Sequence, residues 1–238
     1  MKKLSLLFTK DGLQWHISKG KTVLEEAFHF VTEETSPHLV EEKLDDVLKF
    51  DDYKEIEVIS ALNHFSLTPD TFAEHELGYK LISYNAPVDE ANEELMLSVN
   101  KKFAVQFYYT FPKYFYQKIK AKKLPTKFNF SGEKFLNALT VKNHKEIHIN
   151  LYHHQVEFFA FENKKVVLYN NLDADSEVDF LYFIMFSLSK INFGFAETHF
   201  HIYGETHENE TFISELRKFV KNIKVHFDNA PKKNFVLS

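Results

Sequence analysis

Apolar residues alternate with polar ones at the start of the chain, and this pattern predicts three short strands. The apolar positions are Leu4, Leu6 and Phe8, then Leu13, Trp15 and Ile17, then Val23. A period of two is typical of strands, and the breaks at residues 10–12 and 18–21 contain turn-forming residues. Residues 37–50 then show apolar positions at helical spacing, and residues 56–59 form another apolar strand. The predicted order is strand, strand, strand, helix, strand.

The same order recurs 143 residues further along the chain. The equivalent apolar positions are Ile147, Ile149 and Leu151, then Val156 and Phe158, then Val166. A helix over residues 177–192, capped by Asp175 or Ser176, and a strand over residues 198–203 follow. Two hairpins, a helix and a strand match at this offset over about 55 positions, which indicates an internal duplication.

Both halves continue with alternating helices and strands. The remaining predicted elements are a helix over 70–84, a strand over 103–109, a helix over 112–122, a helix over 208–222 and a strand over 223–227. This order predicts an α/β protein with mixed sheets and helices on both faces. We expect two lobes, spanning residues 1–140, with an inserted segment at 85–102, and residues 141–238.

The composition supports a globular protein and removes several chemistries. The chain has 238 residues, of which 44% are hydrophobic and 26% charged, so it can bury a core. It has no cysteine, which excludes disulfides, a thiol nucleophile and cysteine-based metal sites. No apolar run approaches the length of a membrane span, and the apolar start is too short for a signal peptide. We therefore expect a cytoplasmic protein without membrane insertion.

The duplicated order resembles the actin-like ATPase superfamily, whose two lobes have a ribonuclease-H-like topology with nucleotide between them. The resemblance is carried by the hydrophobic patterns of residues 146–159, 179–182 and 199–204. Within that superfamily the chain is most similar to an uncharacterised bacterial family. Its second half is also similar to the actin-like proteins of type IV pilus assembly and cell division. The resemblance implies two tandem ribonuclease-H-like lobes and, in an active member, bound ATP and magnesium.

The resemblance also implies two glycine-rich hairpins, each preceded by an aspartate, that hold phosphate and magnesium. Bare backbone is needed there because the N–H groups must approach the anion closely. In this chain Asn150 stands in the place of the second aspartate, and bulky residues 152–154 stand in the place of glycines. The possible nucleotide contacts that remain are Lys10, Asp11, Gly12, Asn150 and Gly204. We predict a degenerate nucleotide site with no cofactor, and a weak ATPase is the alternative.

Histidines are the second candidate for chemistry. Seven of the 13 fall between His144 and His207. His148, His199 and His201 lie on neighbouring predicted strands, out of phase with the apolar positions, so their rings could share one face and bind zinc. The alternative is a set of half-buried, hydrogen-bonded histidines without metal.

The charges are unevenly distributed along the first half. Residues 25–94 hold 19 acids and four lysines, whereas residues 95–132 hold eight lysines and no acid. These blocks either neutralise each other within one lobe or form docking surfaces. Lysines and aromatic residues are interleaved over residues 101–127, as in a groove for single-stranded nucleic acid.

These observations together predict a non-catalytic scaffold or binding protein with an actin-like fold. Its partner would be another protein or a second copy of the chain. A nucleic-acid-associated protein that uses residues 101–127 is a further alternative, which the acidic total and the single arginine disfavour.

Overall fold

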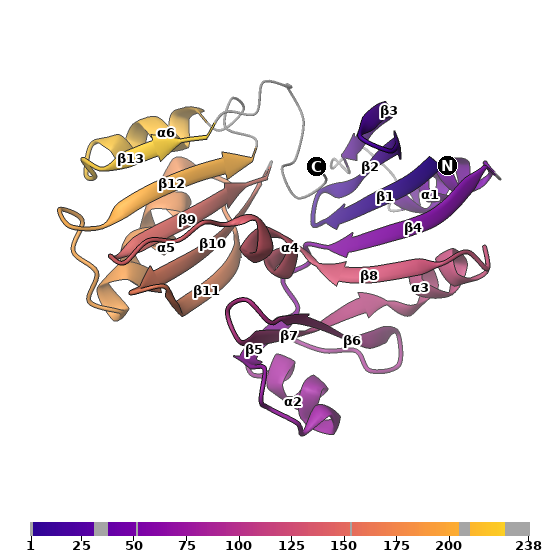
Figure 1. Ribbon diagram of the computed structural model, residues 1–238, viewed down its shortest axis with the longest axis horizontal. Coiled ribbons are helices and arrows are strands. Elements are labelled where there is room, and N and C mark those ends of the chain that lie inside the picture. The colour runs from indigo at the N-terminus through magenta and orange to yellow at the C-terminus, as the bar shows by residue number, and fades with distance from the viewer. Residues whose placement is uncertain (1, 31–37, 51, 153, 205–209, 227–238) are drawn as a thin grey trace. The chain divides into compact units, whose positions relative to one another are not determined.

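A computed structural model describes residues 2–30, 38–50, 52–152, 154–204 and 210–226 of the chain (Figure 1). The chain divides into two compact units, the first ending at Lys134 and the second beginning at Phe135. Both units combine mixed sheets with helices, so the predicted α/β class is confirmed. Within the described part of the chain, no helix is long and apolar enough to cross a membrane.

The main sheet of the first unit has five strands in the order β3-β2-β1-β4-β8. The strands are β1 (Lys2–Thr9), β2 (Gly12–Lys19), β3 (Thr22–Phe30), β4 (Tyr53–Ser60) and β8 (Thr126–Phe130), and helix α1 (Leu39–Leu48) connects β3 to β4. The first three strands are antiparallel, and β4 and β8 run parallel to β1. The predicted order of three strands, a helix and a fourth strand is therefore confirmed.

The sheet of the second unit repeats this arrangement in the order β11-β10-β9-β12-β13. Its elements are β9 (Glu146–Leu151), β10 (Gln155–Glu162), β11 (Lys165–Asp173), α5 (Glu177–Lys190), β12 (His199–Gly204), α6 (Glu210–Arg217) and β13 (Ile223–Val225). The side chain of Ser176 accepts a hydrogen bond from the backbone N–H of Asp179, which confirms one of the two predicted caps of α5.

The strand registers of the two units also correspond. Leu6 pairs with Trp15 in the first antiparallel hairpin, and Ile149 pairs with Phe158 in the second, at the predicted offset of 143. The shared order, direction and register agree with the predicted repeat. A duplication in the history of the chain stays a prediction.

Each main sheet buries one face against its own helices. In the second unit, alternate residues of β9 pack against Phe180, Ile184 and Leu188 of α5 and against Ile213 and Leu216 of α6. The first unit packs β1 and β4 against α1 and against α3 (Lys113–Lys120) in the same way. The period of two in the strands thus separates an apolar face from a second face that carries most of the polar residues.

A third, three-stranded sheet interrupts the first unit between β4 and α3. Its order is β5-β7-β6, with β5 (Phe65–Pro69), β6 (Glu93–Asn100) and β7 (Val105–Pro112). The segment 85–102, predicted as an insert, contains β6, and the excursion extends from β5 to β7. The helix predicted over 70–84 is limited to the short turn η1 (His75–Leu77) and α2 (Gly78–Ser83).

Two glycines with positive φ angles allow a stability test of the backbone. Gly204 has a φ of +81°, and a Cβ atom there would lie 2.3 Å from the carbonyl oxygen of Leu151, whereas Gly20 has a φ of +62° with no atom within 4 Å. We expect Gly204→Ala to lower the free energy of unfolding by about 3 kcal/mol or more, because backbone strain and a clash add. Gly20→Ala is the matched control, with strain alone and a loss of about 1 kcal/mol. Equal losses in denaturant unfolding would contradict the predicted role of close packing.

Candidate functional site

The face of the second sheet opposite its core carries a row of buried polar side chains. Glu146, His148 and Asn150 alternate along β9, and Glu157 lies on the adjacent strand β10; each is at most 1% exposed. His201 comes from β12, directly beside His148 in the parallel register. Burial of so many polar groups requires each to be hydrogen-bonded, which makes this face the best candidate for a site.

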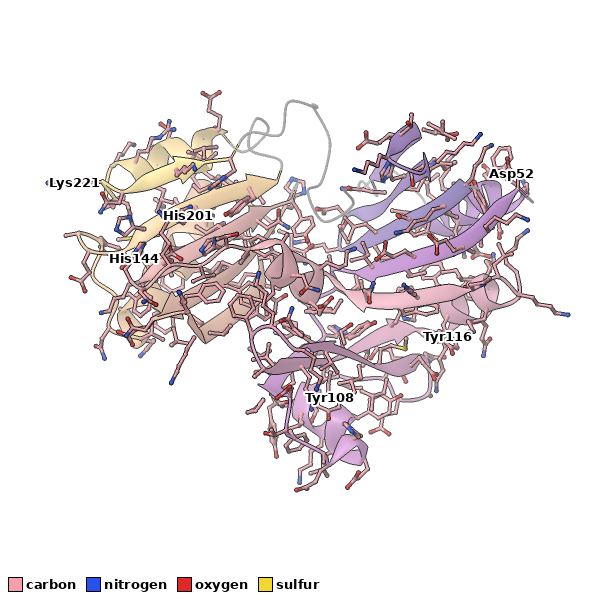
Figure 2. The ribbon with its side chains drawn as sticks, in the orientation of Figure 1. Asp52, Tyr108, Tyr116, His144, His201 and Lys221 are labelled. Carbon is pink, nitrogen blue, oxygen red and sulfur yellow. The ribbon has the colours of Figure 1, made fainter. Side chains whose placement is uncertain are left out.

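The carboxylate of Glu146 is the centre of a histidine cluster, of which His144 and His201 are labelled in Figure 2. Its oxygens lie 2.9 Å from His144 Nε2, 3.3 Å from His148 Nε2 and 3.7 Å from His201 Nε2. The backbone N–H of Lys142 donates a further hydrogen bond of 2.9 Å. Three imidazoles from before β9, from β9 and from β12 thus surround one buried carboxylate.

The Nδ1 atoms of buried His148 and half-buried His201 also have partners. His148 Nδ1 lies 3.2 Å from the hydroxyl of Tyr203, and His201 Nδ1 lies 3.1 Å from His226 Nε2. The rings of His148 and His201 are stacked, with centroids 4.6 Å apart and planes 8° from parallel. The rings of His226 and Tyr203 stack in turn, with centroids 4.3 Å apart. The cluster is therefore a continuous network of rings and hydrogen bonds.

Burial controls the protonation of this network. It lowers the pKa of both His148 and His201 to about 4, and it also lowers the pKa of His226. Burial raises the pKa of Glu146, but hydrogen bonds from Lys142 and His148 outweigh it, so the pKa falls below its ordinary value. At neutral pH the rings of His148 and His201 are therefore neutral beside the Glu146 carboxylate.

Glu146, His148 and His201 offer three ligand atoms within 4.8 Å of one another, the spacing of a candidate metal site. Tetrahedral zinc with bonds of about 2.0–2.1 Å has ligand atoms about 3.3 Å apart. The distances from the Glu146 oxygens to His148 Nε2 and His201 Nε2, 3.3 and 3.7 Å, are close to this value. An ion, however, lies in the plane of each imidazole that binds it, and stacked parallel rings do not share such a position. Zinc binding here requires His201, which is 17% exposed, to rotate out of the stack.

The structure brings only two of the three predicted zinc ligands together. His148 and His201 lie together, whereas the ring of His199 lies against that of His144, with centroids 4.2 Å apart and planes tilted by 44°. The third residue of the candidate metal group is Glu146, which the sequence analysis did not include. Its signal was its position two residues before His148, because such residues share one face of a strand. Zinc binding by the predicted set stays a prediction.

The second hairpin, where the resemblance places phosphate, is filled by side chains. The ring of Tyr152 is 1% exposed, and its hydroxyl donates a 2.9 Å hydrogen bond to Glu157. Tyr169 and Asn150 donate to the same carboxylate at 2.7 and 3.3 Å. All three groups donate, so the two oxygens of Glu157 act as acceptors. His153, which was also predicted to replace a glycine, lies outside the described residues.

Two of the predicted nucleotide contacts lie together in the second unit, but they contact each other. Gly204 packs so closely on β9 that a Cβ atom there would lie 2.5 Å from Asn150 Oδ1. Asn150 Oδ1 is buried and, among the described residues, has no hydrogen-bond partner. The glycine at this position is therefore explained by packing against the neighbouring strand.

The other three predicted contacts belong to the hairpin of the first unit. Lys10 and Asp11 form the two-residue turn between β1 and β2, and Thr9 pairs with Gly12. Lys10 is exposed, whereas Asp11 is buried. A cavity of about 210 Å³ beside this turn is lined mainly by apolar groups, including Phe8 and Phe115. Among the residues that the structure describes, Lys10 is the only charged one that lines it.

The lysine-rich segment folds against the acidic one. Lys118 of α3 forms ion pairs with Asp45 at 2.7 Å and Glu41 at 3.3 Å, both from α1. Several rings of the segment are buried, among them Tyr108 and Phe111, which are at most 1% exposed. These rings are unavailable for stacking on bases, and part of the positive charge is neutralised within the first unit.

A family model described as "Protein of unknown function (DUF3822)" matches residues 1–223, and the chain belongs to that family. A Bacteroides thetaiotaomicron protein with an actin-like ATPase fold and unknown function is 20% identical, with a TM-score of 0.80 over 94% of this chain and 90% of that one. No curated protein gives a significant match.

Two more distant structures share the fold. A chain of the PilM–PilN type IV pilus biogenesis complex is 9% identical, with a TM-score of 0.59 over 94% of this chain and 88% of that one. The cytoplasmic domain of EpsL, from the type II secretion system of Vibrio cholerae, is 7% identical, with a TM-score of 0.54 over 100% of this chain and 92% of that one. The predicted actin-like ATPase fold and the resemblance to pilus proteins are thus confirmed.

The histidine cluster predicts sensitivity to acid. A base whose pKa is lower in the folded state binds fewer protons there than in the unfolded chain, so stability falls as pH decreases. For His148 the window lies between its ordinary pKa of 6.5 and its folded value of about 4. We expect a loss of about 2 to 4 kcal/mol across this window, measured by denaturant unfolding, and a smaller loss in His148→Gln. His38→Gln, an exposed histidine of the first unit, is the control; the same pH slope in all three proteins would contradict the prediction.

The parallel rings give a prediction for metal content. Purified, untagged protein should hold far less than one zinc ion per chain by elemental analysis, because His148 and His201 are held in the stack. One ion per chain that is lost in His148→Ala and kept in His199→Ala would show that the stack opens around a metal.

Proposed function

We propose that this protein is a non-catalytic member of the actin-like fold that binds other protein surfaces and does not hydrolyse ATP. The observation that carries the proposal is the filled second hairpin, in which the buried carboxylate of Glu157 holds the ring of Tyr152 in place. A phosphate-binding turn needs open backbone and positive or neutral surroundings. This turn offers a bulky ring and a buried carboxyl group.

Electrostatics oppose nucleotide binding at this turn. The oxygens of the buried Glu157 carboxyl group carry negative charge density beside the turn, and phosphate oxygens would be repelled by it. Three donors, the side chains of Asn150, Tyr152 and Tyr169, are directed at this carboxyl group and are therefore not available to a phosphate.

The backbone of the turn is also engaged. The N–H of Tyr152 donates a 2.9 Å hydrogen bond to the carbonyl of Gln155, which closes the hairpin on itself. Phosphate loops instead leave successive N–H groups directed at the anion. Sterics, charge and backbone hydrogen bonding therefore all support the loss of the nucleotide site.

The binding role draws support from the relatives that share the fold. One similar structure belongs to the PilM–PilN complex, and another is described as an inner membrane component of a secretion system. Both descriptions are of parts of larger assemblies. A fold that serves as an assembly component in those proteins suits the same use here, although fold alone does not define function.

Nucleic acid is a weaker candidate than protein as the partner. The positive segment 101–127 is paired in part with acids of α1, and its buried rings contribute to the core. Binding of single strands depends on exposed aromatic rings in a positive groove.

Thermal unfolding with Mg-ATP tests the proposed loss of nucleotide binding. A ligand present at 100 times its Kd would stabilise the folded protein by about 2.7 kcal/mol and raise its Tm by several degrees. We expect no rise at millimolar Mg-ATP beyond that produced by magnesium and an inert anion at equal ionic strength. A rise in the natural protein that disappears in Lys10→Ala would contradict the proposal, because it would place nucleotide at the first hairpin.

A further inference from the structure

The middle of helix α5 is apolar on all sides. Its residues 180–186 form an unbroken run of Phe, Leu, Tyr, Phe, Ile, Met and Phe. One side of the helix, with Phe180, Ile184 and Leu188, is buried in the core of the second unit. A helix that is apolar all round is normally buried on all sides. The outer side of α5 is therefore the feature that the fold of this unit leaves unexplained.

The outer side carries three large apolar residues in one line. Val178, Tyr182 and Phe186 are 73%, 59% and 47% exposed, and their spacing of four residues places them on consecutive turns. The rings of Tyr182 and Phe186 stack with centroids 5.7 Å apart. We call these three residues the α5 stripe. Contiguous exposed apolar surface of this kind marks an interaction site.

Charge at the ends of the helix indicates what covers the stripe. Glu177 and Asp179 lie in the first turn of α5, and Lys190 lies in the last turn, with its ammonium group 4.9 Å from the ring centre of Phe186. A second α5 in antiparallel orientation would place Lys190 of each copy beside the acidic turn of the other. An anionic membrane surface would instead meet two acids and one lysine, which it would repel.

The stripe is self-complementary in shape as well. With a two-fold axis at Tyr182, Val178 of one copy lies opposite Phe186 of the other, so that a small side chain faces a large one at both ends. Such an isologous contact uses the same surface on both copies and closes as a dimer. We propose that the chain forms a symmetric dimer through antiparallel packing of the α5 stripe.

The area of the stripe sets the strength of this dimer. A fully buried aromatic side chain contributes about 150–250 Å², so three partly exposed residues supply only a few hundred Å² per copy. Stable dimers bury roughly 800 Å² per partner. The predicted dimer is therefore weak and forms with increasing protein concentration. This inference rests on the proposed role in binding protein surfaces, of which it specifies one partner.

Sedimentation velocity over a range of protein concentrations tests the dimer. The natural protein should shift from monomer to dimer, and Tyr182→Lys should weaken the association at least tenfold, because it buries a charge at the two-fold axis. Tyr84→Lys is the matched control, since Tyr84 is also an exposed tyrosine, at 72%, but lies in the first unit. Both positions are exposed, so both variants should keep the Tm of the natural protein.

Charge reversal tests the orientation of the helices. Lys190→Glu should weaken the dimer because it places acids opposite acids, and the double variant Asp179→Lys with Lys190→Glu should restore it, because Asp179 lies on the same side of the stripe as Lys190. A parallel arrangement would not be restored by the double variant.

Oxidative cross-linking tests the two-fold axis. The chain has no cysteine, so Tyr182→Cys introduces a single thiol, which should form a disulfide between copies under mild oxidation, whereas Tyr84→Cys should not.

Three results would overturn the inference. A monomer at all concentrations would do so, as would a dimer that Tyr182→Lys leaves unchanged, or equal cross-linking at both cysteine positions. The nucleotide measurements are independent of these results. If the protein is a monomer and Mg-ATP does not raise its Tm, the proposed dimer is wrong but the proposed loss of nucleotide binding still stands.

Discussion

The fold depends on one constraint, the alternation of side chains along the central strands β1 and β9. Each of these strands has a neighbour on both sides, so its side chains can only point to the helix-covered face or to the opposite one. Apolar positions take the covered face, and polar positions are left on the other, where many are still buried. Every buried polar group there needs a partner.

The two units meet that need with different chemistry at matched positions. In the first unit the Glu57 carboxylate accepts hydrogen bonds of 2.5 Å from Lys3 and 2.9 Å from Lys134. Burial raises the pKa of Glu57, but these lysines outweigh it and hold the pKa below its ordinary value. The equivalent positions of Lys3 and Glu57 in the second unit hold Glu146 and His201. The histidine cluster therefore occupies positions that correspond to an ion pair of the first unit.

The sequence was sufficient for the repeated part of the fold because period two and period 3.6 are strong there. It missed β8 and α4 (Ser131–Ala138), as well as β5, which has five residues and ends at Pro69. Short strands and proline give weak strand signals. Buried partners such as Glu146 and Glu157 were also missed, because only three-dimensional neighbours show which acids are paired. His148 and His201 were found because their register relative to apolar neighbours is visible in the sequence.

We propose that Tyr152 and the carboxyl group of Glu157 fill the turn between β9 and β10, so that no nucleotide binds there. Hydrogen exchange of the backbone amides from Leu151 to Glu157, measured with and without millimolar Mg-ATP, tests this most directly. The account predicts identical exchange under both conditions. Slower exchange of these amides in the presence of Mg-ATP would contradict it.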